Sequence, residues 1–313
     1  MTNNIDTKLE IDPEQAAGNI QRQIRTLVAA DRADGITLGL SGGVDSAVLA
    51  TLAARAVGPA RLSCWYLYDH HSHPRLRRRA HAVARRLNVR LNCCNITAAM
   101  KRSGIAEPLV MKAFRLFPAL SRLLNTSLAA RLCREMPFLA TLRRDPLALG
   151  PIRSFLYHHT VAAVENAFNA GHVYRRRFLE RHARRNNLLL LGAANKSEWM
   201  VGWFVKNGID DMPLSPLKHL YKTQVIRLAE HLQLPEEVIR QAPSPDMLRG
   251  LNDESALALD YQRLDKILYC LQQGLSDRRI IQAGIDPAHL DLVRKMIQLS
   301  EWKRQPDPPA VAV

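Results

Sequence analysis

Short apolar runs alternate with stretches of helical periodicity through most of the chain. Four runs rich in Leu, Ile, Val and Cys have the length of buried strands, at 36–40, 62–68, 89–94 and 188–191. Around them, apolar residues recur every three or four positions, which predicts helices at 13–30, 46–54, 76–87 and 161–185. Strands that alternate with helices predict an α/β fold, a doubly wound and mostly parallel sheet with flanking helices.

The pattern changes between about residues 107 and 157. Apolar positions recur there at helical spacing, arginines alternate with them, and prolines divide the stretch into short helices. We expect a helical insertion packed on the main core, with a lid, a dimer contact or an interfacial membrane patch as alternatives. A helical C-terminal part is expected at 261–299. The first dozen residues are expected to be loose. A single domain then covers 1–304, and a proline-rich tail at 305–313 is expected to be disordered.

The clearest chemical signal is the turn between the strand at 36–40 and the helix that follows it. Its residues are Gly39, Leu40, Ser41, Gly42, Gly43, Val44, Asp45 and Ser46. Small residues turn tightly and leave backbone N–H groups uncovered at the positive end of a helix, which predicts a phosphate cradle. Ser41 and Ser46 add hydroxyl donors, and Asp45 adds a carboxylate for Mg²⁺. An ordinary glycine turn is the alternative.

A second block repeats this geometry after the strand at 188–191. A turn of small residues, Gly192 to Ala194, leads into a polar helix start that contains Glu198. Because parallel strands end at one edge of a sheet, we expect Glu198 to reach the same edge and complete a metal site with Asp45. The alternative is that Glu198 only stabilises the start of its own helix.

Composition narrows the function classes. The 313 residues carry a net charge of +15, which attracts polyanions. Only 6% of residues are aromatic, and the arginine runs contain too few of them to stack bases, so a nucleic-acid platform is disfavoured. The odd number of cysteines, five, and the absence of a C-x-x-C pair favour a reducing cytoplasm. No apolar run is long enough to span a membrane.

Four potential metal ligands lie within five residues at 69–73. Their spacing is not that of a helical zinc pair, and the sequence offers no obvious second cluster of ligands. A polar loop near phosphates is therefore the favoured interpretation of this segment.

The first turn resembles the SGGxDS loop of the PP-loop ATP pyrophosphatases, which split ATP into AMP and pyrophosphate. Further motifs, Asn195–Glu198, Leu220–Val225 and Ala242–Asp246, make 36–304 similar to ammonia-dependent NAD synthetase, apart from 107–157. The resemblance implies a fold like that of the adenine nucleotide alpha hydrolases, a ligase that forms C–N bonds, and a homodimer. No glutaminase domain precedes the motifs, so free ammonia or a separate glutaminase would supply nitrogen.

The resemblance also implies site residues and a reaction. ATP would bind to the first turn with Ala193, Lys222 and Ser244, while Asp45 and Glu198 hold Mg²⁺. The catalytic residues would be Asp45 and Lys222. The carboxylate of deamido-NAD would attack the α-phosphorus of ATP, pyrophosphate would leave, and ammonia would displace AMP. Substrate contacts would fall on Asn169, Arg175, Lys206 and Lys303.

Several family positions have changed in this chain. A substrate arginine is replaced by Val173, a substrate aspartate by Pro213, a histidine by Trp302, and a threonine that contacts ATP by Ala193. The adenylating half is therefore expected to persist, whereas the carboxylate substrate is either deamido-NAD or another acid, as in a divergent paralogue. A PP-loop enzyme that thiolates or modifies tRNA, and a nucleotide-binding protein without catalysis, are the other hypotheses.

Overall fold

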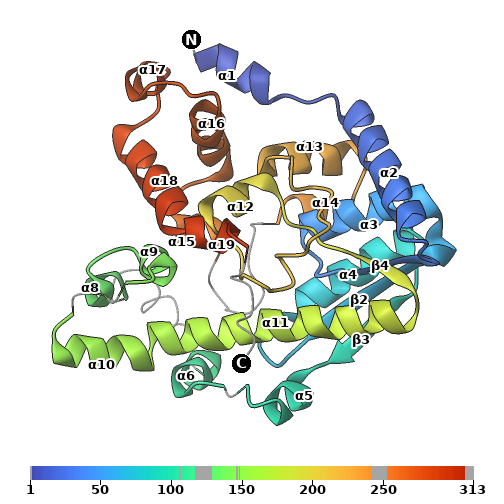
Figure 1. Cartoon of the computed structure of the whole chain (residues 1–313), viewed down its shortest axis with the longest axis horizontal. Helices are drawn as coiled ribbons and strands as arrows, with labels where there is room; N and C mark the ends of the chain where they lie inside the picture. Colours follow the sequence, from blue (N-terminus) through green and yellow to red (C-terminus); the bar gives the residue numbers. More distant parts are fainter. Residues whose placement is uncertain are drawn as a thin grey trace.

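The computed structural model describes residues 2–105, 107–116, 129–145, 147, 149–241 and 252–306. Its centre is a sheet of four parallel strands in the order β3-β2-β1-β4 (Figure 1). The strands are β1 (Gly35–Gly39), β2 (Leu62–Tyr68), β3 (Leu91–Asn95) and β4 (Leu188–Leu191). In the register of the sheet, Ile36 of β1 lies between Leu62 and Leu189. The predicted parallel α/β fold is confirmed.

The strand order determines where a ligand can bind. The chain passes from β1 outward to β2 and β3, and then returns to add β4 on the other side of β1. The connections that leave β1 and β4 therefore diverge, and a crevice opens between them at the carboxyl ends of the strands. The two small-residue turns predicted from the sequence both lie at this switch point.

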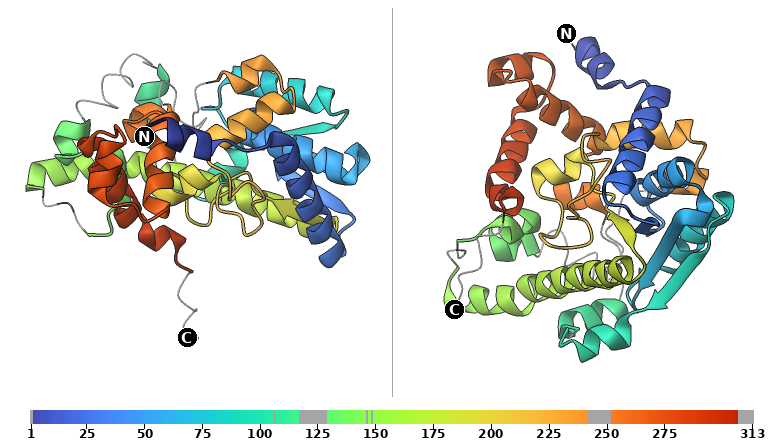
Figure 2. Two further views of the ribbon diagram at one scale, coloured as in Figure 1. Left: turned by 90° about the horizontal axis from the view of Figure 1, so that it is seen from above. Right: turned by 45° about the vertical axis from the view of Figure 1, so that its right-hand side comes forward.

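Helices cover both faces of the sheet (Figure 2). One face carries a large apolar core with α2, α3, α4 and α13, whereas α11 packs on β1 and β4 from the opposite side. The bounds of these helices are α2 (Pro13–Ala30), α3 (Val44–Val57), α4 (Pro74–Arg86), α11 (Val161–Arg185) and α13 (Lys222–His231). The 3₁₀ turn η1 (Pro59–Arg61) follows α3, and α14 (Glu236–Ile239) follows α13. The start of α2 is as predicted, because the Asp12 side chain accepts the backbone N–H groups of Glu14 and Gln15.

Helix α12 and the C-terminal helices form a second apolar core (Figure 1). They are α12 (Lys196–Val201), α15 (Asp253–Leu257), α16 (Tyr261–Gln272), α17 (Asp277–Gln282), α18 (Pro287–Leu299) and α19 (Glu301–Arg304). Positive φ angles of 67° at Gly274 and 87° at Gly284 accompany the two breaks between α16, α17 and α18. The three helices predicted between 261 and 299 are confirmed.

The prediction that the first dozen residues are loose is wrong, because α1 (Thr2–Leu9) is helical. Tertiary contacts hold this short helix on the second core. Ile5 is buried there, and the carbonyl oxygen of Leu9 accepts a 3.0 Å hydrogen bond from the Gln224 side chain. Asp6 also forms a 2.7 Å ion pair with Lys266. Its polar sequence gave no apolar stripe from which a helix could be predicted.

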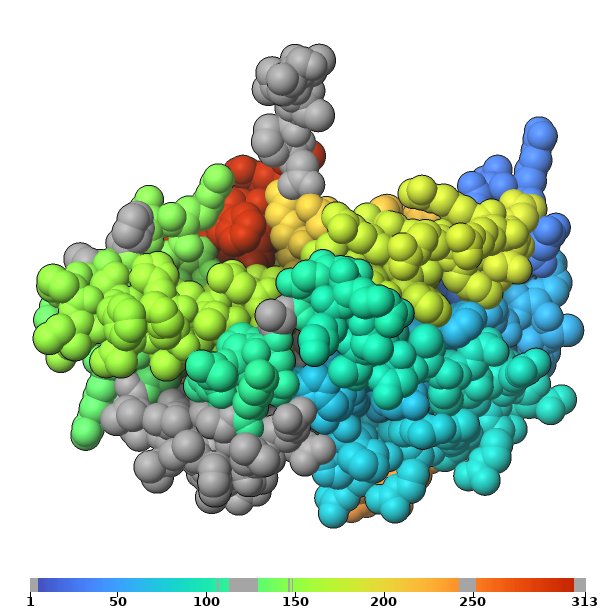
Figure 3. Space-filling model, turned by 90° about the horizontal axis from the view of Figure 1, so that it is seen from below, coloured from blue at the N-terminus to red at the C-terminus, as the bar shows by residue number. Residues whose placement is uncertain are grey.

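The described part of the region between 107 and 157 contains several short helices. The described helices between β3 and α11 are α5 (Thr97–Arg102), α6 (Leu109–Leu116), α8 (Ala129–Cys133), α9 (Pro137–Leu142) and α10 (Pro151–His159). Helix α9 packs on α18, and α10 packs on α8 and α11. Seen from below, α10 and α11 cross one face of the molecule with α5 and α6 beside them (Figure 3). Residues 307–313 of the expected tail lie outside the described part.

None of the described helices combines the length and the apolar character that crossing a bilayer requires.

Candidate active site

The loop after β1 has a shape that requires glycine. Gly42 has a φ of +86°, and a Cβ atom there would lie 2.3 Å from the carbonyl oxygen of Leu76. Gly43 is the N-cap of α3 and has no side chain to cover the first N–H groups of this 14-residue helix. Those groups point out of the helix end with its positive partial charge, which suits a phosphate group.

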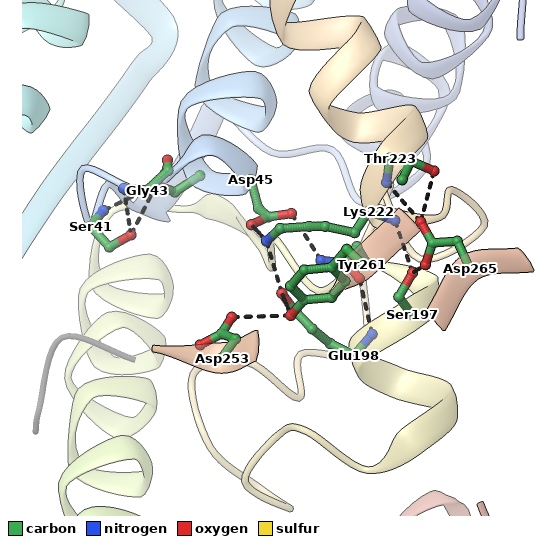
Figure 4. Close-up of polar contacts among 12 residues, drawn as sticks. Ser41, Gly43, Asp45, Ser197, Glu198, Lys222, Thr223, Asp253, Tyr261 and Asp265 are labelled. Atoms are coloured by element: carbon green, nitrogen blue, oxygen red, sulfur yellow. Dashed lines mark hydrogen bonds and ion pairs between the residues drawn. The ribbon is translucent and has the colours of Figure 1, made fainter. Parts of the chain in front are cut away.

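The two serines of the loop brace it from inside. Ser41 Oγ and Ser46 Oγ lie 3.1 Å apart, and Ser46 Oγ donates to the Gly43 carbonyl oxygen at 3.0 Å. The backbone N–H of Gly43 donates to Ser41 Oγ at 3.3 Å. The loop is therefore held in its turn by its own hydroxyl groups, as well as by the glycines (Figure 4).

Lys222 joins the two turns. Its Nζ donates to Asp45 Oδ2 at 2.5 Å and to Glu198 Oε1 at 2.9 Å, and its side chain is only 3% exposed. Asn195, the N-cap of α12, donates from Nδ2 to Asp45 Oδ1 at 2.9 Å and accepts the N–H of Glu198. The predicted convergence of Asp45 and Glu198 is thus present in the fold.

Two further residues complete this cluster. Tyr261 Oη donates to Asp253 Oδ2 at 3.0 Å and lies 3.5 Å from Glu198 Oε1, and its ring faces the Lys222 ammonium (Figure 4). Three carboxyl groups, those of Asp45, Glu198 and Asp253, therefore surround one ammonium group. When all three are ionised the cluster carries a net negative charge, which a divalent cation would offset.

The ionisation of the cluster follows from burial and from charge. Burial, with the nearby carboxylates Asp45 and Asp253, raises the pKa of Glu198 to about 8 despite the attraction of Lys222. For Lys222, burial alone would lower the pKa, but the carboxylates of Asp45 and Glu198 outweigh it and raise the pKa. Burial also raises the pKa of Asp253 and of Tyr261.

Behind the cluster, Asp265 accepts hydrogen bonds from the helices that carry Glu198 and Lys222. Its Oδ1 accepts the hydroxyl proton of Ser197, and its Oδ2 accepts both the N–H and the hydroxyl of Thr223, at 2.8 and 2.7 Å. The N–H of Lys222 in turn donates to Ser197 Oγ at 2.9 Å. One buried carboxyl group thereby ties the start of α12 to the start of α13, and burial raises its pKa to about 6.

The cluster opens into a cavity of about 1160 Å³. Such a volume exceeds that of most sites for one small ligand and leaves room for two nucleotide-sized molecules. The lining includes these residues predicted as ATP or substrate contacts: Gly39, Leu40, Ser41, Gly43, Val44, Asp45, Ser46, Asn169, Arg175, Ala193, Lys222 and Lys303. The fold therefore gathers most of the predicted site around one space.

The predicted substrate contacts lie in different settings. Arg175 lines the cavity, but its guanidinium group is buried and pairs with Asp69 Oδ2 at 3.0 Å. Lys303 also lines it and donates to the carbonyl oxygens of Gly202 and Phe204, while burial lowers its pKa. Lys206 is not among the residues that line the cavity and donates to two backbone carbonyls near the C-terminus. Ser244 lies outside the described residues.

Sequence reasoning missed several buried polar residues of the site. Asp253, Tyr261 and Asp265 come from α15 and α16, which carry no phosphate-loop motif. Glu165 on α11 also lines the cavity, and burial raises its pKa to about 7, against the lowering effects of Lys303 and Asn169. The one feature of the sequence that pointed to Glu165 is its position four residues before Asn169, which places both side chains on the same face of α11.

The residues that replace family residues differ in their contacts and in their exposure to solvent. Trp302 donates from its indole N–H to the carbonyl oxygen of Leu142 at 2.9 Å, which joins α19 to α9. Pro213 is exposed. Asp210, near Pro213, lines the cavity and lies 3.3 Å from His172. An acidic group therefore remains close to the altered loop.

Comparison with known proteins now identifies the family. The model of the family described as NAD synthase matches residues 17–118 and 151–307. The chain belongs to the NAD synthase family. The NH3-dependent NAD+ synthetase of Thermotoga maritima is 30% identical to this family member over 276 residues, which cover 88% of this chain and 91% of the relative. The Rhizobium rhizogenes protein of the same name is 32% identical over 279 residues, with 87% and 81% covered.

Solved structures share the fold of this NAD synthase family member. The NMN synthetase from Francisella tularensis has a TM-score of 0.69 and 20% identity, covering 96% of this chain and 100% of its own. The NH3-dependent NAD synthetase from Campylobacter jejuni has a TM-score of 0.65 and 18% identity, with the same coverage. At these identities the two structures support the fold rather than a choice of substrate.

Proposed function

We propose that this protein is an ATP-dependent amide ligase that activates the nicotinate carboxylate of deamido-NAD and transfers ammonia to it, forming NAD. This is the reaction of the ammonia-dependent members of its family. The observation that carries the proposal is the convergence of Asp45, Glu198 and Lys222 beside the glycine loop, in one cavity large enough for two nucleotides.

The glycine loop is the proposed binding site of the ATP phosphates. The uncovered N–H groups at the start of α3 offer donors, and the Lys222 ammonium offers a positive charge next to them. Catalysis then consists of holding the α-phosphorus and the attacking carboxylate in contact while charge on the leaving pyrophosphate is neutralised. We assign that neutralising role to Lys222, whose buried ammonium stays protonated because carboxylates surround it.

Asp45 and Glu198 are the proposed ligands of Mg²⁺. Carboxylate oxygens are the ligands that this hard cation prefers, and two of them lie on the same ammonium group. The surplus of carboxyl groups over ammonium groups in the cluster also fits a divalent cation, because Lys222 alone faces both Asp45 and Glu198. When bound, Mg²⁺ would neutralise charge on the ATP phosphates.

The acid substrate is proposed to lie against α11 and the chain around 202–210. Asn169, Arg175, Glu165 and Lys303 line that part of the cavity and are the candidates for contact with it. Val173 and Pro213 cannot provide the hydrogen bonds of the residues they replace, and each such bond to a charged group contributes about 1.5–3 kcal/mol. A paralogue that amidates a different carboxylate is therefore the second candidate function.

We further infer a homodimer, ammonia either free or delivered by a separate glutaminase, and a cytoplasmic location. The exposed apolar side chains of Ile152 and Phe155 on α10 support a contact with a second copy. The five cysteines are all free thiols, which supports a reducing compartment. Sedimentation velocity tests the dimer, and a monomer at micromolar concentration would contradict it.

The test is a product assay with ATP, Mg²⁺, ammonium and deamido-NAD. We expect equal amounts of pyrophosphate, AMP and NAD, and we expect Asp45→Asn to abolish all three without unfolding the protein. AMP formation only with other carboxylic acids would favour the paralogue. If no carboxylate stimulates AMP formation, the ligase proposal is wrong.

A further inference from the structure

Two adjacent histidines and a glutamate converge outside the cavity. His70 and His71 follow β2, and Glu107 precedes α6 (Leu109–Leu116). His70 Nε2 lies 3.3 Å from Glu107 Oε1, and His71 Nε2 lies 3.1 Å from the same oxygen. Together the ligand atoms of the three residues lie within 4.8 Å of one another. The sequence showed the histidines, but Glu107 is more than 30 positions away and only the fold adds it.

The spacing of these atoms matches a tetrahedral metal site. With metal–ligand bonds of about 2.0–2.1 Å, neighbouring ligands of tetrahedral Zn²⁺ lie about 3.3 Å apart. Both nitrogen–oxygen distances are close to that value. Within the described part of the chain, His70 Nε2 makes no hydrogen bond of acceptable direction, even though Glu107 Oε1 is 3.3 Å away.

The backbone around the histidines is fixed by a neighbouring carboxylate. Asp69 Oδ1 accepts the N–H of His71 at 2.8 Å and that of Ser72 at 3.2 Å, and Asp69 Oδ2 pairs with Arg175. Asp69 is 5% exposed, so the ion pair with Arg175 and the two backbone hydrogen bonds hold its carboxylate in a largely buried position. A turn held in this way presents two imidazoles without further ordering, which favours metal binding.

We propose that His70, His71 and Glu107 form a binding site for a zinc-class divalent cation. Two imidazole nitrogens and one carboxylate are a common zinc ligand set, and they leave the fourth position for water or another small ligand. The side chain of His70 is 31% exposed, against 11% for His71 and 15% for Glu107, so the cation would enter on the His70 side. This site is separate from the proposed Mg²⁺ site, which has oxygen ligands only, and it does not depend on the ligase function.

Such a cation would join two segments that border the cavity. The loop with the histidines continues into α4, and Glu107 leads into α6; Leu76 of α4 and Val110 of α6 both line the cavity wall. A metal there would therefore hold the wall in place, which predicts a higher melting temperature with Zn²⁺.

The test uses untagged, chelator-treated full-length protein and Zn²⁺ in competition with a chromogenic chelator. Excess Mg²⁺ competes with Zn²⁺ for the carboxylates of Asp45 and Glu198. The variants are Glu107→Gln and His70→Ala, and the matched control replaces the adjacent pair His158 and His159 of α10 by alanine. Co²⁺ provides a second readout, because four-coordinate Co²⁺ absorbs visible light far more strongly than six-coordinate Co²⁺.

We expect one equivalent of Zn²⁺ with the wild-type protein and with the control. Loss of a residue that only hydrogen-bonds to a metal ligand already weakens metal affinity about 10–100-fold, so loss of a direct ligand should weaken it more than roughly 100-fold. Intense Co²⁺ bands should disappear in both variants, and Zn²⁺ should no longer raise their melting temperatures. Equal affinity in Glu107→Gln and wild type, or weak six-coordinate Co²⁺ spectra in the wild type, would overturn the proposal and leave a hydrogen-bonded His–Glu group.

Discussion

Replacement of Lys222 by methionine should show how strongly the carboxylate cluster depends on its single ammonium group. Methionine retains most of the length of lysine but removes the charge. The lysine side chain is 3% exposed, and its partners Asp45 and Glu198 are 18% and 16% exposed, so the ion pairs are largely shielded from water. Removal of one partner from a buried ion pair costs about 3–5 kcal/mol, because the remaining charges are left uncompensated.

Urea unfolding at pH 8 in the absence of divalent cations, monitored by circular dichroism, measures this cost. The matched control is Lys266→Met, since Lys266 pairs with Asp6 in an exposed ion pair of the kind that contributes about 0–1 kcal/mol. We expect Lys222→Met to lower the free energy of unfolding by about 3–5 kcal/mol. Lowering the pH should reduce this loss, because the carboxyl groups left behind become protonated.

A divalent cation should rescue the variant in part. If Mg²⁺ binds to Asp45 and Glu198, a concentration 100 times its dissociation constant restores about 2.7 kcal/mol. Equal losses for Lys222→Met and Lys266→Met would refute the reasoning, because the Lys222 pairs would then behave like a surface ion pair. If Mg²⁺ does not raise the free energy of unfolding of Lys222→Met itself, the metal role of the two carboxylates is contradicted.

Three further predictions concern the same site. Burial raises the pKa of Glu198 in the folded protein to about 8, whereas in the unfolded chain this group ionises near 4.5. The free energy of unfolding of the wild type should therefore fall as pH rises from about 4.5 to 8, and Glu198→Gln should weaken this trend in urea titrations. Gly42→Ala should abolish ATP binding in calorimetry, since its Cβ would meet the Leu76 carbonyl; unchanged affinity would contradict the cradle. Asp265→Asn should lower kcat by more than its effect on the free energy of unfolding accounts for. Recovery of kcat in Asp265→Glu would argue against a positioning role.

Much of the fold followed from local patterns. The strands and the long α11 carry strong periodicity, and the turns after β1 and β4 carry small residues with a polar helix start. The convergence of Asp45 and Glu198 was also predictable, because parallel strands end at one edge and β1 and β4 are neighbours there.

The rest depends on contacts that no local pattern encodes. Asp253, Tyr261 and Asp265 reach the cluster from helices far along the chain, where each reads as an ordinary capping or amphipathic residue. Helix α1 forms because Ile5, Leu9 and two polar contacts hold it against the rest of the protein, which a polar N-terminal sequence does not reveal. Glu107 meets the histidines only once β3 and α5 have placed it beside the end of β2.

The most direct test of the proposed activity is exchange of labelled pyrophosphate into ATP in the absence of ammonia. A carboxylate that is adenylated reversibly at the glycine loop supports this exchange, and it isolates the first half of the reaction from amide formation. We predict exchange that requires deamido-NAD and Mg²⁺ together and that disappears in Asp45→Asn. Absence of exchange with every carboxylate tried, in protein that binds ATP, would contradict the account.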